Sequence, residues 1–147
     1  MFFLFFLFSS CGNNIYQQYY SFNDNAWHSD SLINYKYNII DTINPYTLSL
    51  NIRHTTDYKF QNLFVFLDGY YQDTVEIILA NKNGKWLGSG ISDIRELNYV
   101  FDDNRIFYKK GEYKLIVEQA MRYGDEEKIK NLENILDIGL IISEKNE

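Results

Sequence analysis

The sequence is poor in the residues from which metal and redox sites are built. Its 147 residues include two histidines, two methionines and a single cysteine. One cysteine cannot form an internal disulfide bond or a cysteine-based zinc cage. The chain also lacks a basic face, because its formal net charge is -6 and its lysines and arginines are scattered. Nucleic acid is therefore not expected as a partner.

Neither histidine stands at a metal-binding spacing. His28 and His54 belong to no H-x-x-x-H or H-E-x-x-H arrangement, and we interpret both as surface or hydrogen-bonded side chains. The run Asp102-Asp103-Asn104 lacks the glycine and the distant glutamate of an EF-hand loop, so a solvated turn is the favoured interpretation. We predict no metal ligands and no cofactor.

The sequence likewise offers no nucleophile. Gly88-Ser89-Gly90 lacks the flanking residues that expose a catalytic serine between a strand and a helix, and its glycines instead favour a bulge or sharp bend beside Trp86. Arg53 and Arg122 lie at or beyond strand ends, where either could pair with a carboxylate such as Asp57 or Asp137. We predict no catalytic residues and a protein that is not an enzyme.

Aromatic residues, by contrast, are abundant, with 13 tyrosines and 11 phenylalanines among 18% aromatic residues. Such rings suit the half-buried surface of a β-sheet. Trp86 and Trp27, with several tyrosines, could form a flat platform of the kind that sugar-binding β-sandwiches use. We favour the interpretation that both tryptophans fill the core or its rim. Carbohydrate binding is kept as the alternative function.

The most apolar stretch is the amino terminus. Residues 1–10 form an apolar run that ends in Ser9-Ser10, and Cys11 and polar residues follow. This pattern predicts a signal peptide, too short to span a bilayer, with cleavage before a lipidated Cys11. Phe8 stands where a lipoprotein signal usually has leucine, and no basic residue precedes the apolar run. Both features are compatible with Met1 lying inside a longer natural signal peptide. The alternative is a buried apolar terminus with a free cysteine.

Alternation of apolar and polar residues predicts an all-β chain. We assign residues 11–30 to a lipidated tether and a first strand near 16–22, and residues 31–147 to the folded domain. Residues 33–39 and 46–53 alternate and are predicted to pair in antiparallel fashion. Residues 58–67 become apolar on both faces after Asn62, as a central strand in a two-layer structure would be.

The second half of the chain continues this pattern. Strands are predicted at 74–80, 111–120 and 138–142, and a turn is predicted at 81–84. Residues 125–134 allow one short turn of helix. Residues 92–104 receive no assignment. About eight strands without a long helix predict an antiparallel, jelly-roll-like β-sandwich. The side chains predicted to face its core are Tyr35, Tyr37, Leu48, Leu50, Val65, Ile77, Tyr113, Leu115, Val117 and Leu140.

Several segments, taken in order, resemble one known family. They are Cys11, Trp27, Leu50-Asn51-Ile52-Arg53, residues 57–63, Asp73-Thr74, residues 84–90, Gly111-Glu112-Tyr113, Gln119-Ala120-Met121-Arg122, Leu132 and Asp137-Ile138-Gly139-Leu140. Together they resemble the gliding-motility lipoprotein GldH family of the Bacteroidetes. The resemblance implies a cell-envelope lipoprotein associated with gliding or with a wider secretion-linked role, and it brings no active-site residues with it.

From these observations we expect a non-enzymatic protein held by lipid in the cell envelope. Gly12-Asn13-Asn14-Ile15 carries no acidic cluster of the kind that resembles a surface-export signal, which favours the periplasmic face of the outer membrane. The expected partners are the membrane, through the lipid, and other envelope or gliding-motility proteins. Acyl chains anchor strongly, at about 0.8 kcal/mol per buried methylene, so the domain should need no membrane-binding face of its own.

Overall fold

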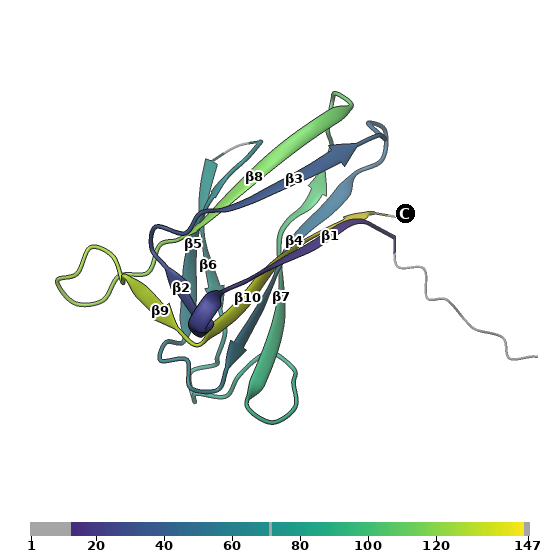
Figure 1. Cartoon of the computed structure of the whole chain (residues 1–147). Helices are drawn as coiled ribbons and strands as arrows, with labels where there is room; N and C mark the ends of the chain where they lie inside the picture. Colours follow the sequence, from purple (N-terminus) through teal and green to yellow (C-terminus); the bar gives the residue numbers. More distant parts are fainter. Residues whose placement is uncertain (1–12, 71, 146–147) are drawn as a thin grey trace, which may run out of the picture.

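The computed structural model describes residues 13–70 and 72–145, and within them the chain is built of antiparallel strands and one short 3-10 helix (Figure 1). The expected signal segment and Cys11 lie outside the described residues. The elements are β1 (Asn14–Ser21), η1 (Asn23–Asn25), β2 (Ala26–His28), β3 (Ile33–Ile39), β4 (Tyr46–Thr55), β5 (Asn62–Asp68), β6 (Gln72–Ile78), β7 (Ile94–Arg105), β8 (Gly111–Gln119), β9 (Asn131–Glu133) and β10 (Ile135–Glu144). Among the described residues no helix is long and apolar enough to cross a membrane.

Two four-stranded sheets form the layers of a β-sandwich. The first sheet has the strand order β1-β10-β4-β7 and the second has the order β3-β8-β5-β6. The short strands β2 and β9 form a separate two-stranded sheet. The all-β antiparallel sandwich predicted from the sequence is therefore confirmed, with β2, β7 and β9 as strands that the sequence pattern did not reveal.

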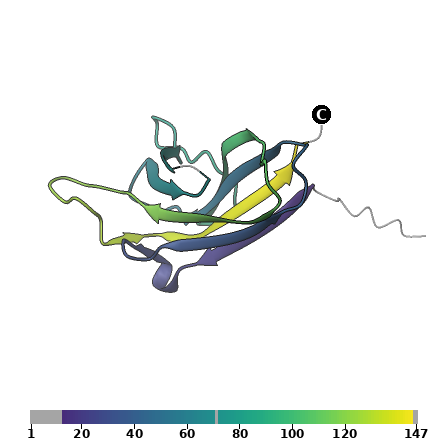
Figure 2. The same ribbon diagram turned by 90° about the horizontal axis from the view of Figure 1, so that it is seen from above.

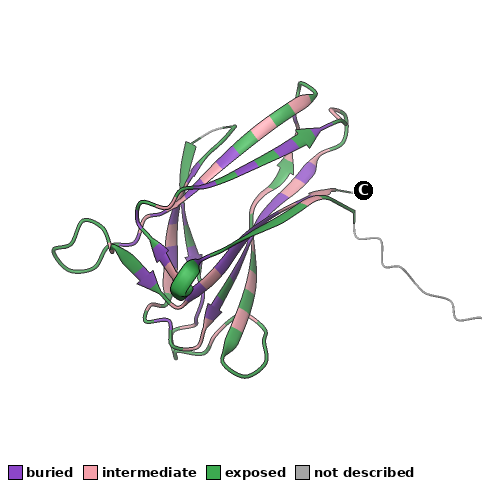
Figure 3. Cartoon of the chain, in the orientation of Figure 1, coloured by how far each residue is buried: buried purple, intermediate pink, exposed green. Residues whose placement is uncertain are grey.

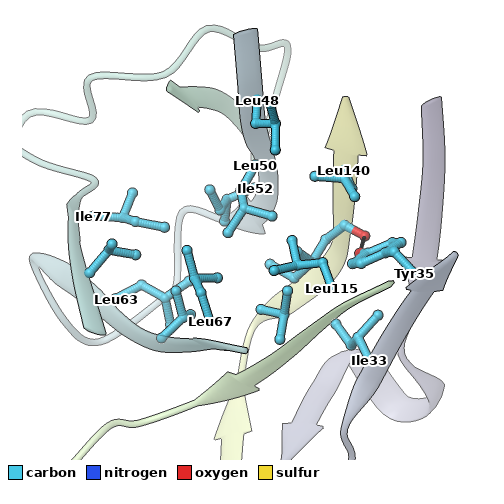
Figure 4. Close-up of a cluster of buried hydrophobic side chains, with 14 of the residues drawn as sticks. Ile33, Tyr35, Leu48, Leu50, Ile52, Leu63, Leu67, Ile77, Leu115 and Leu140 are labelled. Carbon is cyan, nitrogen blue, oxygen red and sulfur yellow. Dashed lines mark hydrogen bonds between the residues drawn. The ribbon is translucent and has the colours of Figure 1, made fainter. Parts of the chain in front are cut away.

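Burial follows the alternation of the sequence. In β3 every second side chain is buried and the intervening ones are exposed, and burial also alternates along β5 and the second half of β8 (Figure 3). Because side chains point to opposite faces of a sheet in turn, one face of each layer supplies the core. The core side chains of the two sheets meet between the layers (Figure 4).

The predicted core is confirmed at nine of its ten positions, and Tyr113 is half-buried at the core's edge. The sheets are also joined by a hydrogen bond, since the hydroxyl of Tyr35 in β3 donates to the carbonyl oxygen of Ile138 in β10 at 2.5 Å. Burial of the Tyr35 ring raises the pKa of its hydroxyl well above the usual value. The donor is thus retained across the physiological range.

The expected pairing of residues 33–39 with 46–53 is wrong. Strand β3 pairs with β8, whereas β4 lies between β10 and β7 in the opposite sheet. The connection at 40–45 therefore crosses from one layer to the other. Alternation shows that both segments are half-buried strands, but it carries no information on which strand each one pairs with.

The short helical turn allowed at 125–134 is also wrong. This region forms turns and then β9, in which Leu132 pairs with Trp27 of β2. Two apolar residues, Ile129 and Leu132, at helical spacing are too few to establish a helix period. The unassigned residues 92–104 form most of β7, an edge strand with apolar side chains on both faces, which hides its alternation.

Connections alternate between the two ends of the sandwich. The proximal end consists of Asn13, residues 40–45, 69–70 and 106–110, and Lys145; the distal end consists of residues 22–32, 55–61, 79–93 and 120–134. The start of β1 pairs with the last residues of β10, so both ends of the described chain meet at the proximal end. In Figures 1 and 2 the segment between β8 and β9 projects away from that end.

Candidate functional site

The distal end gathers most of the segments that carry the family resemblance. Residues 57–63, 84–90 and 119–122 form or flank its loops, and residues 137–140 lie at the adjoining start of β10. Asp73-Thr74 and Gly111-Glu112-Tyr113 are exceptions, because they begin strands at the proximal end. Segments far apart in sequence are thus brought together at one end of the sandwich, which makes it the candidate functional site.

A ring cluster closes the core at this end. His54 is fully buried, with its ring centroid 4.6 Å from that of Trp86 and 5.8 Å from that of Tyr58. Its Nδ1 lies 2.8 Å from the carbonyl oxygen of Thr55, whereas its buried Nε2 has no hydrogen-bond partner. Burial lowers the pKa of His54, only partly offset by the Thr55 bond. A neutral histidine held among rings is a structural group and a poor proton carrier at neutral pH.

The loop beyond Trp86 depends on two glycines for a close backbone approach. A Cβ added to Gly88 would lie 2.5 Å from the carbonyl oxygen of Glu96, and one added to Gly90 would lie closer still to that of Ile94. Between them, Ser89 and Glu96 exchange backbone hydrogen bonds of 3.0 and 2.8 Å. The sharp bend expected beside Trp86 is confirmed, and Ser89 lies in an extended bridge.

That loop presents apolar side chains to solvent. Leu87 is 52% exposed and Ile91 is 90% exposed. Across the distal end, Tyr123 is 70% exposed and packs edge-on against Phe60, at a centroid distance of 5.8 Å. The distal end therefore exposes these three large apolar side chains.

A pocket of about 370 Å³ opens beside Tyr123. Phe60, Ile129 and Leu132 supply its apolar lining, and Glu126 and the ion pair of Lys59 with Glu133, at 3.6 Å, lie among its polar residues. Gln119 fixes one wall, because its side-chain amide donates to the carbonyl oxygen of Ile129 and accepts from the N–H of Met121. The volume suits one or two apolar side chains of a partner.

The outer face of the first sheet adds a polar strip next to the distal end. Arg53 of β4 pairs with Asp137 of β10 at 2.7 Å, which confirms one of the two partners considered for it. Burial raises the pKa of Asp137, opposed by the neighbouring Arg53. Two register positions along β4, Asn51 lies opposite Gly139; its side chain is 5% exposed and its Oδ1 has no hydrogen-bond partner.

Both tryptophans belong to the core or its rim, as favoured from the sequence. Trp27 is fully buried, stacks on Phe22 at 5.0 Å and donates its Nε1–H to the carbonyl oxygen of Ser31. Trp86 is half-buried against His54. Neither ring therefore lies open on the surface as a sugar-binding platform.

The remaining residues singled out from the sequence are not brought together. His28 is exposed beside Asp30. The solvated turn favoured for Asp102-Asp103-Asn104 is wrong, because these residues form the end of β7, where the ladder with β4 carries a register shift. Asp102 pairs with Arg105, Asp103 pairs with Lys145, and the N–H of Asn104 donates to the Asp102 carboxylate. Within the described ranges no three His, Cys, Asp or Glu side chains are arranged to hold a metal ion.

Arg122 follows β8 at the distal end and lines a shallow depression with Phe64 and Phe66 on the outer face of the second sheet. The prediction for the lipidated Cys11 falls outside the described residues.

Sequence reasoning missed the pocket at Phe60 and Tyr123. Its residues come from three separate segments, 59–60, 123–129 and 131–133. The available signal was the family resemblance, since segment 57–63 and Leu132 contribute to the lining and segment 119–122 borders it.

Comparison with known proteins gives a consistent result. Residues 14–142 match the GldH lipoprotein family. A gliding motility lipoprotein GldH homolog of Christiangramia forsetii is 37% identical over 148 residues, covering 95% of this chain and 90% of the relative. Gliding motility lipoprotein GldH of Flavobacterium johnsoniae is 33% identical over 147 residues, covering 95% and 91%. No solved structure matches the chain.

Proposed function

Because the chain belongs to the GldH lipoprotein family, we propose that it is a non-enzymatic component of gliding motility, or of an associated envelope or secretion assembly, anchored by lipid at Cys11. The observation that carries this proposal is the match to gliding motility lipoproteins along 95% of the chain. The lipid chains hold the protein at the outer membrane, and the domain faces the periplasm.

The chemistry of the described surface supports a binding role. The buried histidine is neutral and enclosed by rings, and the carboxylate with the raised pKa, Asp137, is already paired with Arg53. The distal end instead offers Leu87, Ile91 and Tyr123 beside an apolar pocket. Hydrophobic and aromatic side chains in and around a pocket are typical anchors for a protein partner.

The partner should present an apolar side chain next to a basic one. Glu126 and Glu133 line the pocket with one lysine, Lys59, so the local charge is negative. A partner segment with an aromatic or aliphatic residue flanked by lysine or arginine would match both the cavity and this charge.

Lipidation is tested by metabolic labelling with a fatty-acid probe, followed by membrane fractionation. The wild-type chain should be labelled and sediment with the membrane, and Cys11→Ser should lose both properties. Ser10→Ala keeps a small residue before the cysteine and serves as the matched control. Unchanged label and fractionation in Cys11→Ser would refute the anchor.

Placement is tested by protease treatment of intact cells. We expect the protein to resist digestion until the outer membrane is broken. Digestion in intact cells would place the domain on the cell surface instead.

Motility is tested by complementing a deletion strain with the wild-type gene, Cys11→Ser or Ser10→Ala. Only Cys11→Ser should fail to restore spreading.

A further inference from the structure

The proximal end exposes apolar side chains that the sandwich does not need for its core. Ile40 is 66% exposed and Ile43 82% exposed in the β3–β4 loop, and Tyr108 is 78% exposed in the β7–β8 loop. The two loops are neighbours, because Ile39 at the end of β3 pairs with Gly111 at the start of β8. With Ile91 and Tyr123 of the distal end, these three are the most exposed large hydrophobic side chains of the described ranges.

Internal bonds hold the β3–β4 loop in shape. One carboxylate oxygen of Asp41 accepts from the backbone N–H groups of Ile43 and Asn44, and the other accepts from the Asn44 side-chain amide. The hydroxyl of Tyr46 donates to the carbonyl oxygen of Asp41 at 2.8 Å. A turn tied down in this way presents Ile43 outward as part of its structure.

Two exposed lysines lie beside these side chains, next to the carboxylate of Asp41 in the β3–β4 loop. Lys109 and Lys110 follow Tyr108 directly and are exposed. Tyrosine is enriched at membrane interfaces, where its ring meets the acyl boundary and its hydroxyl meets water. Lysine adds attraction to phosphate headgroups while its methylene stem covers apolar surface.

The position of the expected anchor brings this end to the membrane. Cys11 precedes the first residue of β1, Asn14, by three positions, and three extended residues span at most about 11 Å. Asn13 lies at the proximal end, where its carbonyl oxygen accepts from the N–H of Glu144. A lipid on Cys11 therefore keeps the proximal loops within reach of the bilayer that holds it.

We propose that the proximal end is a membrane-docking surface: Ile40, Ile43 and Tyr108 enter the headgroup region of the leaflet that holds the anchor, so that the domain stands with its distal end pointing away. This inference rests on the proposed lipid at Cys11. It differs from the expectation that the domain needs no membrane-binding face, because the loops here set orientation and the lipid supplies attachment.

The test compares two isoleucines of similar exposure at opposite ends of the domain. Because Cys11 is the only cysteine and is consumed by lipid, Ile43→Cys and Ile91→Cys can each be labelled with an environment-sensitive fluorophore in the full lipidated chain. The labelled chains are reconstituted into vesicles of phosphatidylethanolamine with a minor fraction of phosphatidylglycerol. We expect a blue shift, and quenching by lipid-borne quenchers, at position 43 and neither at position 91.

Two further variants test the source of that signal. In the labelled Ile43→Cys chain, adding Ile40→Asp and Tyr108→Asp should reverse the blue shift while the protein still floats with the vesicles. Replacing the exposed residues Leu87 and Tyr123 of the distal end by aspartate is the matched control and should leave it unchanged.

The outcomes separate this inference from the proposed function. If the chain floats with the vesicles but the fluorophore at position 43 reports water, docking is overturned and the anchor stays intact. The same holds if the fluorophores at positions 43 and 91 both report lipid. If the fluorescence of the label at position 43 shifts to the blue with isolated cell membranes but not with the pure lipid vesicles, the surface contacts a membrane protein and docking on lipid is overturned. A wild-type chain that does not float would refute the anchor and docking together.

Discussion

Replacing the buried His54 by leucine should remove a pH-dependent loss of stability. In the folded protein the ring is neutral, fully buried and packed against Trp86 and Tyr58. Burial lowers its pKa below the ordinary value of 6.5. In the unfolded chain the same side chain is solvated and titrates normally.

The sign follows from proton binding. As the pH falls below 6.5, the unfolded chain takes up a proton on His54 that the folded chain does not, so the free energy of unfolding falls. The loss grows by at most about 1.4 kcal/mol for each pH unit below 6.5 and stops growing once the pH falls below the lowered folded-state pKa. Above 6.5 the contribution to stability is fully present.

The assay is urea unfolding of the full chain at pH 7.5 and pH 5.5. His54→Leu removes the titrating group together with the unpartnered Nε2 and the bond to Thr55, and the difference in pH dependence from wild type isolates its effect from that of the carboxylates. His28→Leu makes the same replacement at an exposed histidine and is the matched control. Identical pH dependence in wild type and His54→Leu would show that the ring is solvated, against the structure.

Three more changes follow from the structure, each read out by chemical denaturation. Leu50→Ala and Leu115→Ala should each cost about 2–5 kcal/mol, because both side chains lie in the core, and a cost near zero at both would overturn the register. Arg53→Met should destabilise more than Asp137→Asn at neutral pH, because the first leaves a buried carboxylate unpaired; equal effects would argue against the burial of Asp137. Gly90→Ala should cost about 1–2 kcal/mol and speed amide exchange at Ser89 and Glu96, because the two bridging hydrogen bonds must separate, whereas Ser89→Ala should do neither.

Alternation of side chains was enough to predict most of the strands and most of the core. The pattern in β3 is local, since each of its buried residues is separated from the next by one exposed residue. The burial of Tyr35, Leu50 and Leu115 follows from that rule without knowledge of the partner strands. Edge strand β7 escaped the same rule because it carries apolar side chains on both faces, which hides its alternation.

Strand pairing could not be predicted in this way. The segments 33–39 and 46–53 look like a hairpin, yet the turn held by Asp41 leads from one sheet to the other. Whether such a connection makes a hairpin or changes layers depends on strands that come much later in the chain, β8 and β10. Long-range pairing of this kind leaves no mark within a short sequence window.

The candidate site was predicted even less completely, for the same physical reason. Arg53 and Asp137 were recognised as possible partners because charged residues stand out in the sequence, and they do form an ion pair. Nothing in the sequence linked Phe60, Tyr123 and Leu132 to one another. Only the fold places them around one pocket at the distal end.

Photocrosslinking in living cells tests the central claim most directly. A photoreactive amino acid replaces Tyr123 at the distal end or Tyr108 at the proximal end, two tyrosines that are 70% and 78% exposed. We expect position 123 to give a discrete crosslink to another envelope protein, and position 108 to give none with protein because it faces lipid. No protein crosslink at position 123, or the same protein captured from both positions, would contradict a lipid-anchored domain that binds its partner with the distal end.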